Sequence, residues 1–126
     1  MPEPDDFMQR HIGSIIDTPE SIHGKMIGEE VIVYGISKNM IPTGENTGII
    51  YLENDRTFAS SKDVVYIEID ENNNLSKIIK EGITNFLYNR QTFVRGHIKD
   101  RKVVTHMGNT TIEYLIKPDY DIRVVL

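Results

Sequence analysis

One stretch of the chain, TFVRGHIKDRK at positions 92–102, concentrates side chains that could bind anions. It contains a single acid, Asp100, although the net charge of the whole chain is −5. Cationic side chains bind the phosphates of nucleic acids, and displaced counterions make that binding salt-dependent. The stretch is therefore a candidate for the phosphate-facing part of a binding surface. Its four cations are Arg95, Lys99, Arg101 and Lys102.

The predicted strands also carry aromatic residues that alternation places on the outer surface. Side chains of a strand point alternately to its two faces. In DVVYIEID, apolar residues at 65, 67 and 69 point inward and leave Tyr66 outward; the same pattern turns Tyr51, Phe93 and Arg95 outward. Single strands need flat rings for their bases and cations for their backbone. The candidate nucleic-acid-binding residues are Tyr34, Lys38, Tyr51, Arg56, Lys62, Tyr66, Phe93, Arg95, Lys99, Arg101 and Lys102.

These residue types have a structural explanation as well. Tyrosine is favoured on strands whatever the function, and charged residues on an edge strand deter aggregation. The rings could instead pack under the N-terminal segment or against a partner protein. The acids Glu53, Glu68 and Asp70, outward or at strand ends, would repel phosphates. A protein-interaction surface therefore stays open beside a nucleic-acid surface.

The chain shows no arrangement of residues typical of catalysis or of cofactor binding. There is no Ser-His-Asp order, no glycine-rich phosphate loop and no paired-carboxylate spacing. The segment DENNNLSKIIKE (70–81) places oxygen ligands at calcium-loop spacing, but Leu75 stands where that loop needs glycine. A polar turn before a helix explains the same residues. The four histidines are dispersed, so the sequence predicts a non-enzymatic protein with no metal and no cofactor; they are His11, His23, His97 and His106.

Composition bounds the class of protein. The 126 residues are enough for one hydrophobic core, and the absence of cysteine excludes disulfides and thiolate metal sites. The N-terminal MPEPDDFMQRH lacks the pattern of a secretory signal, and no apolar run is long enough to span a membrane. We therefore expect a cytoplasmic protein with no membrane association. The net charge also varies along the chain, because residues 84–126 hold seven cations and four acids.

β-Branched and aromatic runs predict most of the chain to be strands. We expect residues 1–27 to be an irregular or partly helical extension that packs against one end of a domain formed by residues 28–126. Strands are predicted at 29–37, 48–54 and 63–70, with a bulge or sharp bend at Gly35 and a loop at 39–48. After residue 91 the chain returns to strands, and Gly108-Asn109 looks like a two-residue hairpin turn. Arg101 and Lys102 are assigned to a turn after the strand 92–99.

One helix is predicted between the third and fourth strands. In ENNNLSKIIKEGITNFLYN, apolar residues from Leu75 to Leu87 recur at i, i+3, i+4, i+8, i+11 and i+12, which forms one stripe. Asn73 or Asn74 is a suitable N-cap. Gly82 in the middle weakens the helix or marks a close approach to the sheet.

The order of these elements resembles the OB fold, a small barrel found in oligonucleotide-binding proteins. The resemblance rests on MIGEEVIVYGISKN (26–39) as the first strand with its bend glycine, on GIIYLEND (48–55) as the second, and on NRQTFVRGHIKD (89–100) after the helix. It implies a mainly β, five-stranded antiparallel barrel with one helix between strands three and four; an extra C-terminal hairpin follows here. It also implies a binding face over strands two and three, rimmed by loops. The chain departs from nucleic-acid-binding members in having no tryptophan and a negative charge.

Two hypotheses follow for the function. The first is binding of single-stranded DNA or RNA through an aromatic and basic face on strands two to four. The second is a protein-interaction or assembly module, a homo-oligomer or a subunit of a larger complex, that does not contact nucleic acid.

Overall fold

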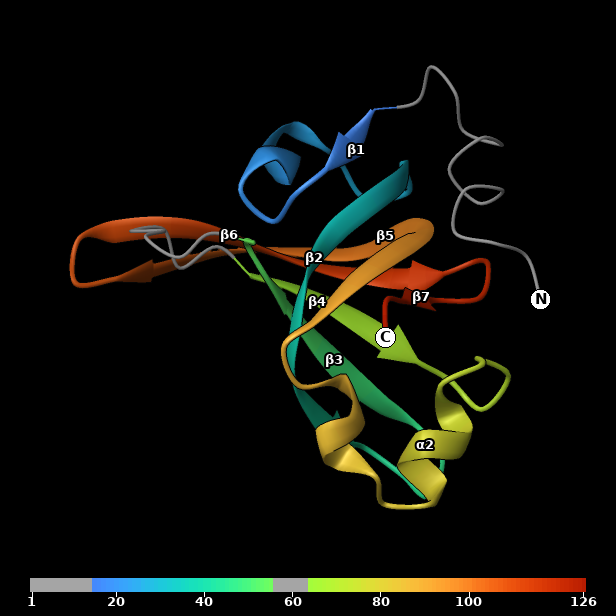
Figure 1. Cartoon of the computed structure of the whole chain (residues 1–126). Coiled ribbons are helices and arrows are strands. Elements are labelled where there is room, and N and C mark those ends of the chain that lie inside the picture. Colours follow the sequence, from blue (N-terminus) through green and yellow to red (C-terminus); the bar gives the residue numbers. More distant parts are fainter. Residues whose placement is uncertain (1–14, 56–63) are drawn as a thin grey trace.

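Five strands form a closed ring in the computed structural model, which describes residues 15–55 and 64–126. Around the ring the neighbours are β2, β3, β4, β6 and β5, and β5 pairs again with β2 (Figure 1). The expected five-stranded barrel is confirmed, and its pairings are antiparallel except for β4–β6, which is parallel. The five strands are β2 (Glu30–Pro42), β3 (Gly48–Glu53), β4 (Val64–Ile69), β5 (Arg90–His106) and β6 (Asn109–Pro118).

The barrel interior is filled by the apolar side chains that alternation assigns to the inside. The intervening residues Tyr51, Tyr66 and Phe93 stay partly exposed. Full burial of such an apolar side chain stabilises the fold by about 1.5–3 kcal/mol. A slip by one residue would move the whole set to solvent, so the core also determines which side chains face outward. Inward residues that are at most 1% exposed include Ile50, Leu52, Ile67, Val94 and Ile98.

The one α-helix predicted between the third and fourth barrel strands is confirmed, since a single α-helix lies between β4 and β5, but it is shorter than the apolar stripe from Leu75 to Leu87. α2 (Ser76–Lys80) ends before Gly82, whose φ of 72° is incompatible with continuing a right-handed helix. A 3-10 helix, η2 (Thr84–Leu87), follows. Both still contribute to the core, since Ile79 is 6% and Leu87 is 0% exposed. They cover one end of the barrel, at the bottom of Figure 1, as the element order predicts.

The residues before α2 form a polar turn. The Asn72 N–H donates to Asp70 Oδ1 and the Leu75 N–H donates to Asn73 Oδ1, both at 2.9 Å. Asn74 is turned to the C-terminal segment, where its side chain donates to the Ile122 carbonyl and accepts from the Ile122 N–H. The helix therefore has no side-chain N-cap from Asn73 or Asn74, and these contacts support the polar turn over the calcium loop.

β5 is longer than predicted, and an irregularity in it changes which side chains face outward. The strand continues through Arg101 and Lys102, which we predicted to lie in a turn. Its register with β6 shifts between Ile98 and Asp100, as at a β-bulge. Ile98 points inward before the shift, and Arg101 pairs with the buried Tyr114 after it. Alternation is therefore reversed in the second half of the strand.

The extra C-terminal hairpin is the outer part of β5 and β6 themselves. We call residues 103–112 the β5–β6 ribbon; in the described part of the chain they pair only with one another. Its turn is Met107-Gly108, one residue earlier than predicted, with φ of 50° and 81°. The ribbon projects from the barrel at the left of Figure 1. β7 (Arg123–Val124) then pairs with β5.

β2 extends to Pro42, into the stretch predicted as a loop. Its irregularity lies between Ser37 and Met40, where the register with β3 shifts. At Gly35 a Cβ would lie 2.8 Å from the Glu53 carbonyl oxygen, close to where β2 passes from pairing with β5 to pairing with β3. The glycine allows β2 and β3 to approach closely.

The described part of the N-terminal extension packs on the barrel. β1 (Ile16–Asp17) pairs in parallel with β2, and the 3-10 helix η1 (Ser21–Gly24) buries Ile22 completely. The hydroxyl of Tyr114 joins this segment to the barrel, since it lies 2.8 Å from the carbonyl oxygens of both His23 and Lys25. No helix in residues 15–55 and 64–126 is long and apolar enough to cross a bilayer.

Candidate nucleic-acid interface

Two outward tyrosines meet on neighbouring strands of the barrel. Tyr51 of β3 pairs with Tyr66 of β4, and their rings lie edge to face, with centroids 5.1 Å apart and an interplanar angle of 87°. The row continues across the sheet, because Tyr66 pairs with Leu115 of β6, which pairs with Asp100 of β5. We call this outer surface the β3–β4–β6 face. Its central row is aromatic and apolar over three strands and ends in a carboxylate.

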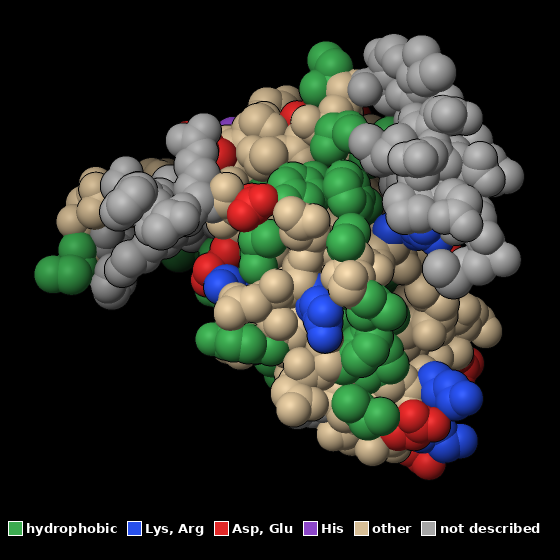
Figure 2. All heavy atoms as spheres, in the orientation of Figure 1, with side chains coloured by type: hydrophobic (Ala, Val, Ile, Leu, Met, Phe, Trp, Pro, Cys, Tyr) green, Lys and Arg blue, Asp and Glu red, His purple; other side chains and the backbone are tan. Residues whose placement is uncertain are grey.

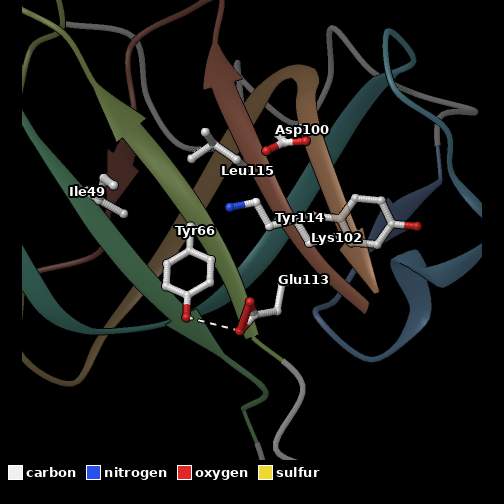
Figure 3. Close-up of a pocket in the computed structure, with 7 residues that line it drawn as sticks. All are labelled: Ile49, Tyr66, Asp100, Lys102, Glu113, Tyr114 and Leu115. Carbon is white, nitrogen blue, oxygen red and sulfur yellow. Dashed lines mark hydrogen bonds between the residues drawn. The ribbon is translucent and has the colours of Figure 1, made fainter. Parts of the chain in front are cut away.

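A second row beside it carries charge and completes a shallow pocket. Lys102 of β5 pairs with Glu113 of β6, and the Tyr66 hydroxyl donates to Glu113 Oε1 at 3.3 Å. The pocket has a volume of about 250 Å³, and in Figure 3 the Lys102 side chain extends into it between Tyr66 and Leu115. Its lining residues are Ile49, Tyr66, Asp100, Lys102, Glu113, Tyr114 and Leu115.

The surroundings of Tyr66 keep its hydroxyl protonated. Burial raises the pKa of Tyr66 to about 12, and the charge of Glu113 adds to the effect. Both causes disfavour the phenolate. Tyr66 therefore presents a neutral ring and a hydrogen-bond donor to this face.

The electrostatics of the β3–β4–β6 face are mixed. Lys99 donates to Glu68 Oε2 at 2.6 Å, so its charge is compensated. Lys102 and Lys117 have no ion pair with another residue of the described chain. In Figure 2, basic side chains on the described part of the visible surface form no continuous patch; they lie apart, or next to acidic side chains as at the lower right.

The other predicted aromatic residues lie on a different surface, which we call the β2–β5 face. Tyr34 of β2 pairs with Phe93 of β5, and their ring centroids are 4.8 Å apart. Arg95 contacts Glu30 at 2.9 Å and stacks over the Tyr120 ring at 4.6 Å. The split arises because residues 90–97 of β5 pair with β2, whereas residues 96–106 pair with β6. Phe93 and Arg95 therefore do not join the Tyr51–Tyr66 pair.

The remaining predicted cations do not form one patch. Lys38 contacts Asn89 at 2.5 Å and lies 5.8 Å from the centre of the Tyr88 ring. Arg101 donates from Nε to the buried Tyr114 hydroxyl at 3.2 Å, which is a structural contact. Arg56 and Lys62 lie outside the described residues. Of the eleven predicted site residues, the structure brings together Tyr51, Tyr66 and Lys102, with Lys99 at their edge.

Sequence reasoning missed the pocket residues Asp100, Glu113 and Leu115. Alternation along β6 places Glu113 and Leu115 on the outer surface, because Tyr114 and Ile116, which alternate with them, are buried. Asp100 had no such signal, since the register shift at Lys99 reverses the pattern.

A potential metal-ligand group was also missed. Ligand atoms of Glu30, His97 and Asp119 lie within 4.8 Å of one another, from three separated parts of the chain. Arg95 already compensates the charge of Glu30, which weakens the attraction of this exposed group for a cation.

Comparison with known proteins supports the fold. No protein-family profile matches the chain, and no curated protein has a matching sequence. Among solved structures, one described as OBody AM3L09 bound to hen egg-white lysozyme has a TM-score of 0.50 and 19% identity, over 86% of this chain and 87% of that one.

Two further structures agree less well in shape. The Plasmodium falciparum SSB in complex with ssDNA has a TM-score of 0.42 and 12% identity, over 80% of this chain and 96% of that one. A small single-stranded DNA-binding protein from Streptomyces coelicolor has a TM-score of 0.39 and 13% identity, over 80% and 97%. At sequence identities this low, a structural similarity concerns the fold and does not extend to the function. The ring of strands and its connections, together with the similarity to the OBody, identify the domain as an OB fold.

Proposed function

We propose that the domain binds single-stranded nucleic acid through the β3–β4–β6 face and catalyses no reaction. The observation that carries the proposal is the outward Tyr51–Tyr66 pair with Lys102 beside it. Bases stack on aromatic rings without strong sequence preference. The pair lies on the second and third barrel strands, where OB folds bind oligonucleotides. That last point is an analogy of fold, because a fold does not by itself select a ligand.

The charges of the face indicate that stacking contributes more to this binding than phosphate contacts do. Among residues 15–55 and 64–126, Lys102 and Lys117 are the cations of this face that have no ion pair, and Glu53, Glu68, Asp100 and Glu113 lie on the same side of the sheet. With two phosphate contacts, the affinity for a single strand should fall about sevenfold between 50 and 200 mM salt. A dominant phosphate interaction would give a much steeper fall.

Fluorescence anisotropy with labelled single strands tests the proposal. Tyr66→Ala should weaken binding at least fivefold, because stacking contributes about 1–3 kcal/mol per base. Tyr120→Ala is the matched control, since that ring is 51% exposed but belongs to the β2–β5 face. Lys102→Glu should weaken binding more than Arg95→Glu. The proposal fails if no strand binds at low salt, where the electrostatic attraction is strongest.

A second candidate function is assembly with another protein through the β5–β6 ribbon. Two apolar side chains of the ribbon are strongly exposed, Val103 at 60% and Met107 at 88%. Exposed apolar side chains on unpaired strand edges favour contact with another chain. Light scattering should then show an oligomer that Val103→Thr with Met107→Thr dissociates, whereas Ile41→Thr, which is 51% exposed on β2, leaves it intact. A monomer at all concentrations would exclude self-assembly.

A further inference from the structure

The pocket on the β3–β4–β6 face combines apolar walls with two carboxylates. Tyr66, Ile49 and Leu115 provide apolar surface, while Asp100 and Glu113 stand on adjacent strands. Carboxylates repel phosphates, so they do not serve the backbone of a nucleic acid. An ionised carboxylate can only accept hydrogen bonds. The pocket is therefore suited to a flat group that presents N–H donors.

Lys102 adds a donor next to these acceptors. It pairs across the β5–β6 ladder with Glu113, so the two side chains leave the sheet at one level. Lys102 extends between Tyr66 and Leu115, and Glu113 lies below it beside the Tyr66 hydroxyl (Figure 3). An ammonium group has three donors and no acceptor. The pocket thus offers the two acceptor oxygens of a carboxylate, with the donor group of Lys102 beside them.

Among the bases, guanine has the complementary edge. Its N1–H and 2-amino group are neighbouring donors, and its O6 beside them is an acceptor. Adenine and cytosine place a ring-nitrogen acceptor next to a single amino group, which would repel a carboxylate. Thymine and uracil place one N–H between two carbonyl groups, which is also unfavourable. A carboxylate next to an ammonium group therefore favours guanine.

Glu113 is better placed than Asp100 to accept these donors. Asp100 Oδ1 already accepts the N–H of Arg101 at 2.8 Å. Within the described chain Glu113 accepts one hydrogen bond, from the Tyr66 hydroxyl at 3.3 Å, which orients the carboxylate and leaves its other lone pairs available. The Tyr66 side chain thus both orients Glu113 and supplies part of the apolar wall.

We infer that the pocket binds one guanine base of a single strand, with Glu113 accepting from N1–H and the 2-amino group and Lys102 donating to O6. This inference rests on the proposed function and gives it a base preference. A bidentate pair of this kind discriminates by about fivefold or more against other bases.

Anisotropy with labelled thymidine pentamers that differ only in the central base tests the inference. A single central guanine avoids guanine quadruplexes. The guanine pentamer should bind at least about fivefold more tightly than those with central adenine, cytosine or thymine, and hypoxanthine, which lacks the 2-amino group, should be intermediate. Glu113→Gln and Asp100→Asn each remove one negative charge from the pocket, so both should raise general affinity for the strand. Only Glu113→Gln should abolish the preference for guanine over hypoxanthine.

The possible outcomes distinguish failure of the guanine preference from failure of single-strand binding itself. Equal binding of all five pentamers overturns the guanine preference and leaves single-strand binding standing. No binding of any pentamer, nor of longer strands at low salt, overturns both. A guanine preference that persists in Glu113→Gln but disappears in Asp100→Asn overturns the assignment of Glu113. Circular dichroism of both variants establishes that they are folded.

Discussion

The Tyr114 hydroxyl offers a sharp test of how the N-terminal segment is held on the barrel. The ring is completely buried, and the hydroxyl accepts from Arg101 Nε at 3.2 Å. It lies 2.8 Å from the carbonyl oxygens of His23 and Lys25, and its single hydrogen can serve one of them at a time. Tyr114→Phe removes these contacts and keeps the ring, so no large cavity forms.

The expected cost follows from these partners. One partly buried carbonyl oxygen loses its donor, at about 1–3 kcal/mol. The Arg101 guanidinium is partly exposed and can turn to water, so its loss adds little. We therefore expect the free energy of unfolding to fall by about 1–3 kcal/mol. Tyr88→Phe is the control, because that side chain is 58% exposed and its change should stay within about 0.5 kcal/mol.

Urea unfolding followed by circular dichroism measures this difference, since the chain has no tryptophan. Hydrogen exchange shows which segment is destabilised. The Lys25 amide, which donates to the Ile22 carbonyl, should exchange faster in Tyr114→Phe. Equal stability of Tyr114→Phe and wild type would refute the reasoning. So would a loss of stability with unchanged exchange in this segment, because the hydroxyl would then act elsewhere.

Three further predictions concern other parts of the fold. Gly96→Ala should destabilise the protein by more than about 2 kcal/mol in urea, because its Cβ would lie 2.1 Å from a β6 carbonyl oxygen, whereas Gly24→Ala has open space and should be tolerated. Absorbance titration at alkaline pH should show Tyr66 ionising near pH 12, and Glu113→Gln should lower that pKa. The pKa of an unfolded tyrosine is about 10, so the stabilisation from neutral Tyr66 is present below pH 10 and is lost as the pH rises to 12; a Tyr66 transition at pH 10 would contradict this. Asn74→Ala removes two hydrogen bonds of 2.9 Å to the segment before β7, so it should cost about 1–3 kcal/mol and speed exchange in β7, and unchanged exchange would contradict this role.

The barrel could be predicted because its strands carry simple signals. Alternation of β-branched residues assigned the inside and outside of β3, β4 and the first half of β5 correctly. Each such strand buries one face only, so a pattern of period two is enough to orient it.

The end of the α-helix at Lys80 could not be predicted from the sequence. The apolar stripe from Leu75 to Leu87 persists across a break, because two short helices on one end of the barrel need the same buried residues as one longer helix. The positive φ of Gly82 and the ψ of 69° at Ile83 separate the two arrangements. A glycine permits that conformation without requiring it, so its presence does not decide between them.

The candidate site could be predicted in its residue types but not in their grouping. Tyr51 and Tyr66 lie on strands that follow one another in the sequence, so alternation within each strand was enough to predict that both point outward. Phe93 and Arg95 were assigned to the same surface, although β5 leaves β2 and joins β6 along its length. The register shift at Lys99 then turns Arg101 toward Tyr114 and Lys102 outward. No residue type in the sequence predicts such a shift.

The closure of the ring has a consequence for the order in which the protein folds. β3 with β4, and β5 with β6, are neighbours in sequence, so each hairpin can form in microseconds. The pairings Glu30 with His97 and Val65 with Tyr114 join parts of the chain that lie far apart, and their loop-closure entropy must be overcome before they add stability. Folding in milliseconds to seconds is expected for such a topology. The β3–β4–β6 face is therefore complete only after the parallel β4–β6 pairing forms, so an isolated β3–β4 hairpin would carry both tyrosines and still lack the pocket.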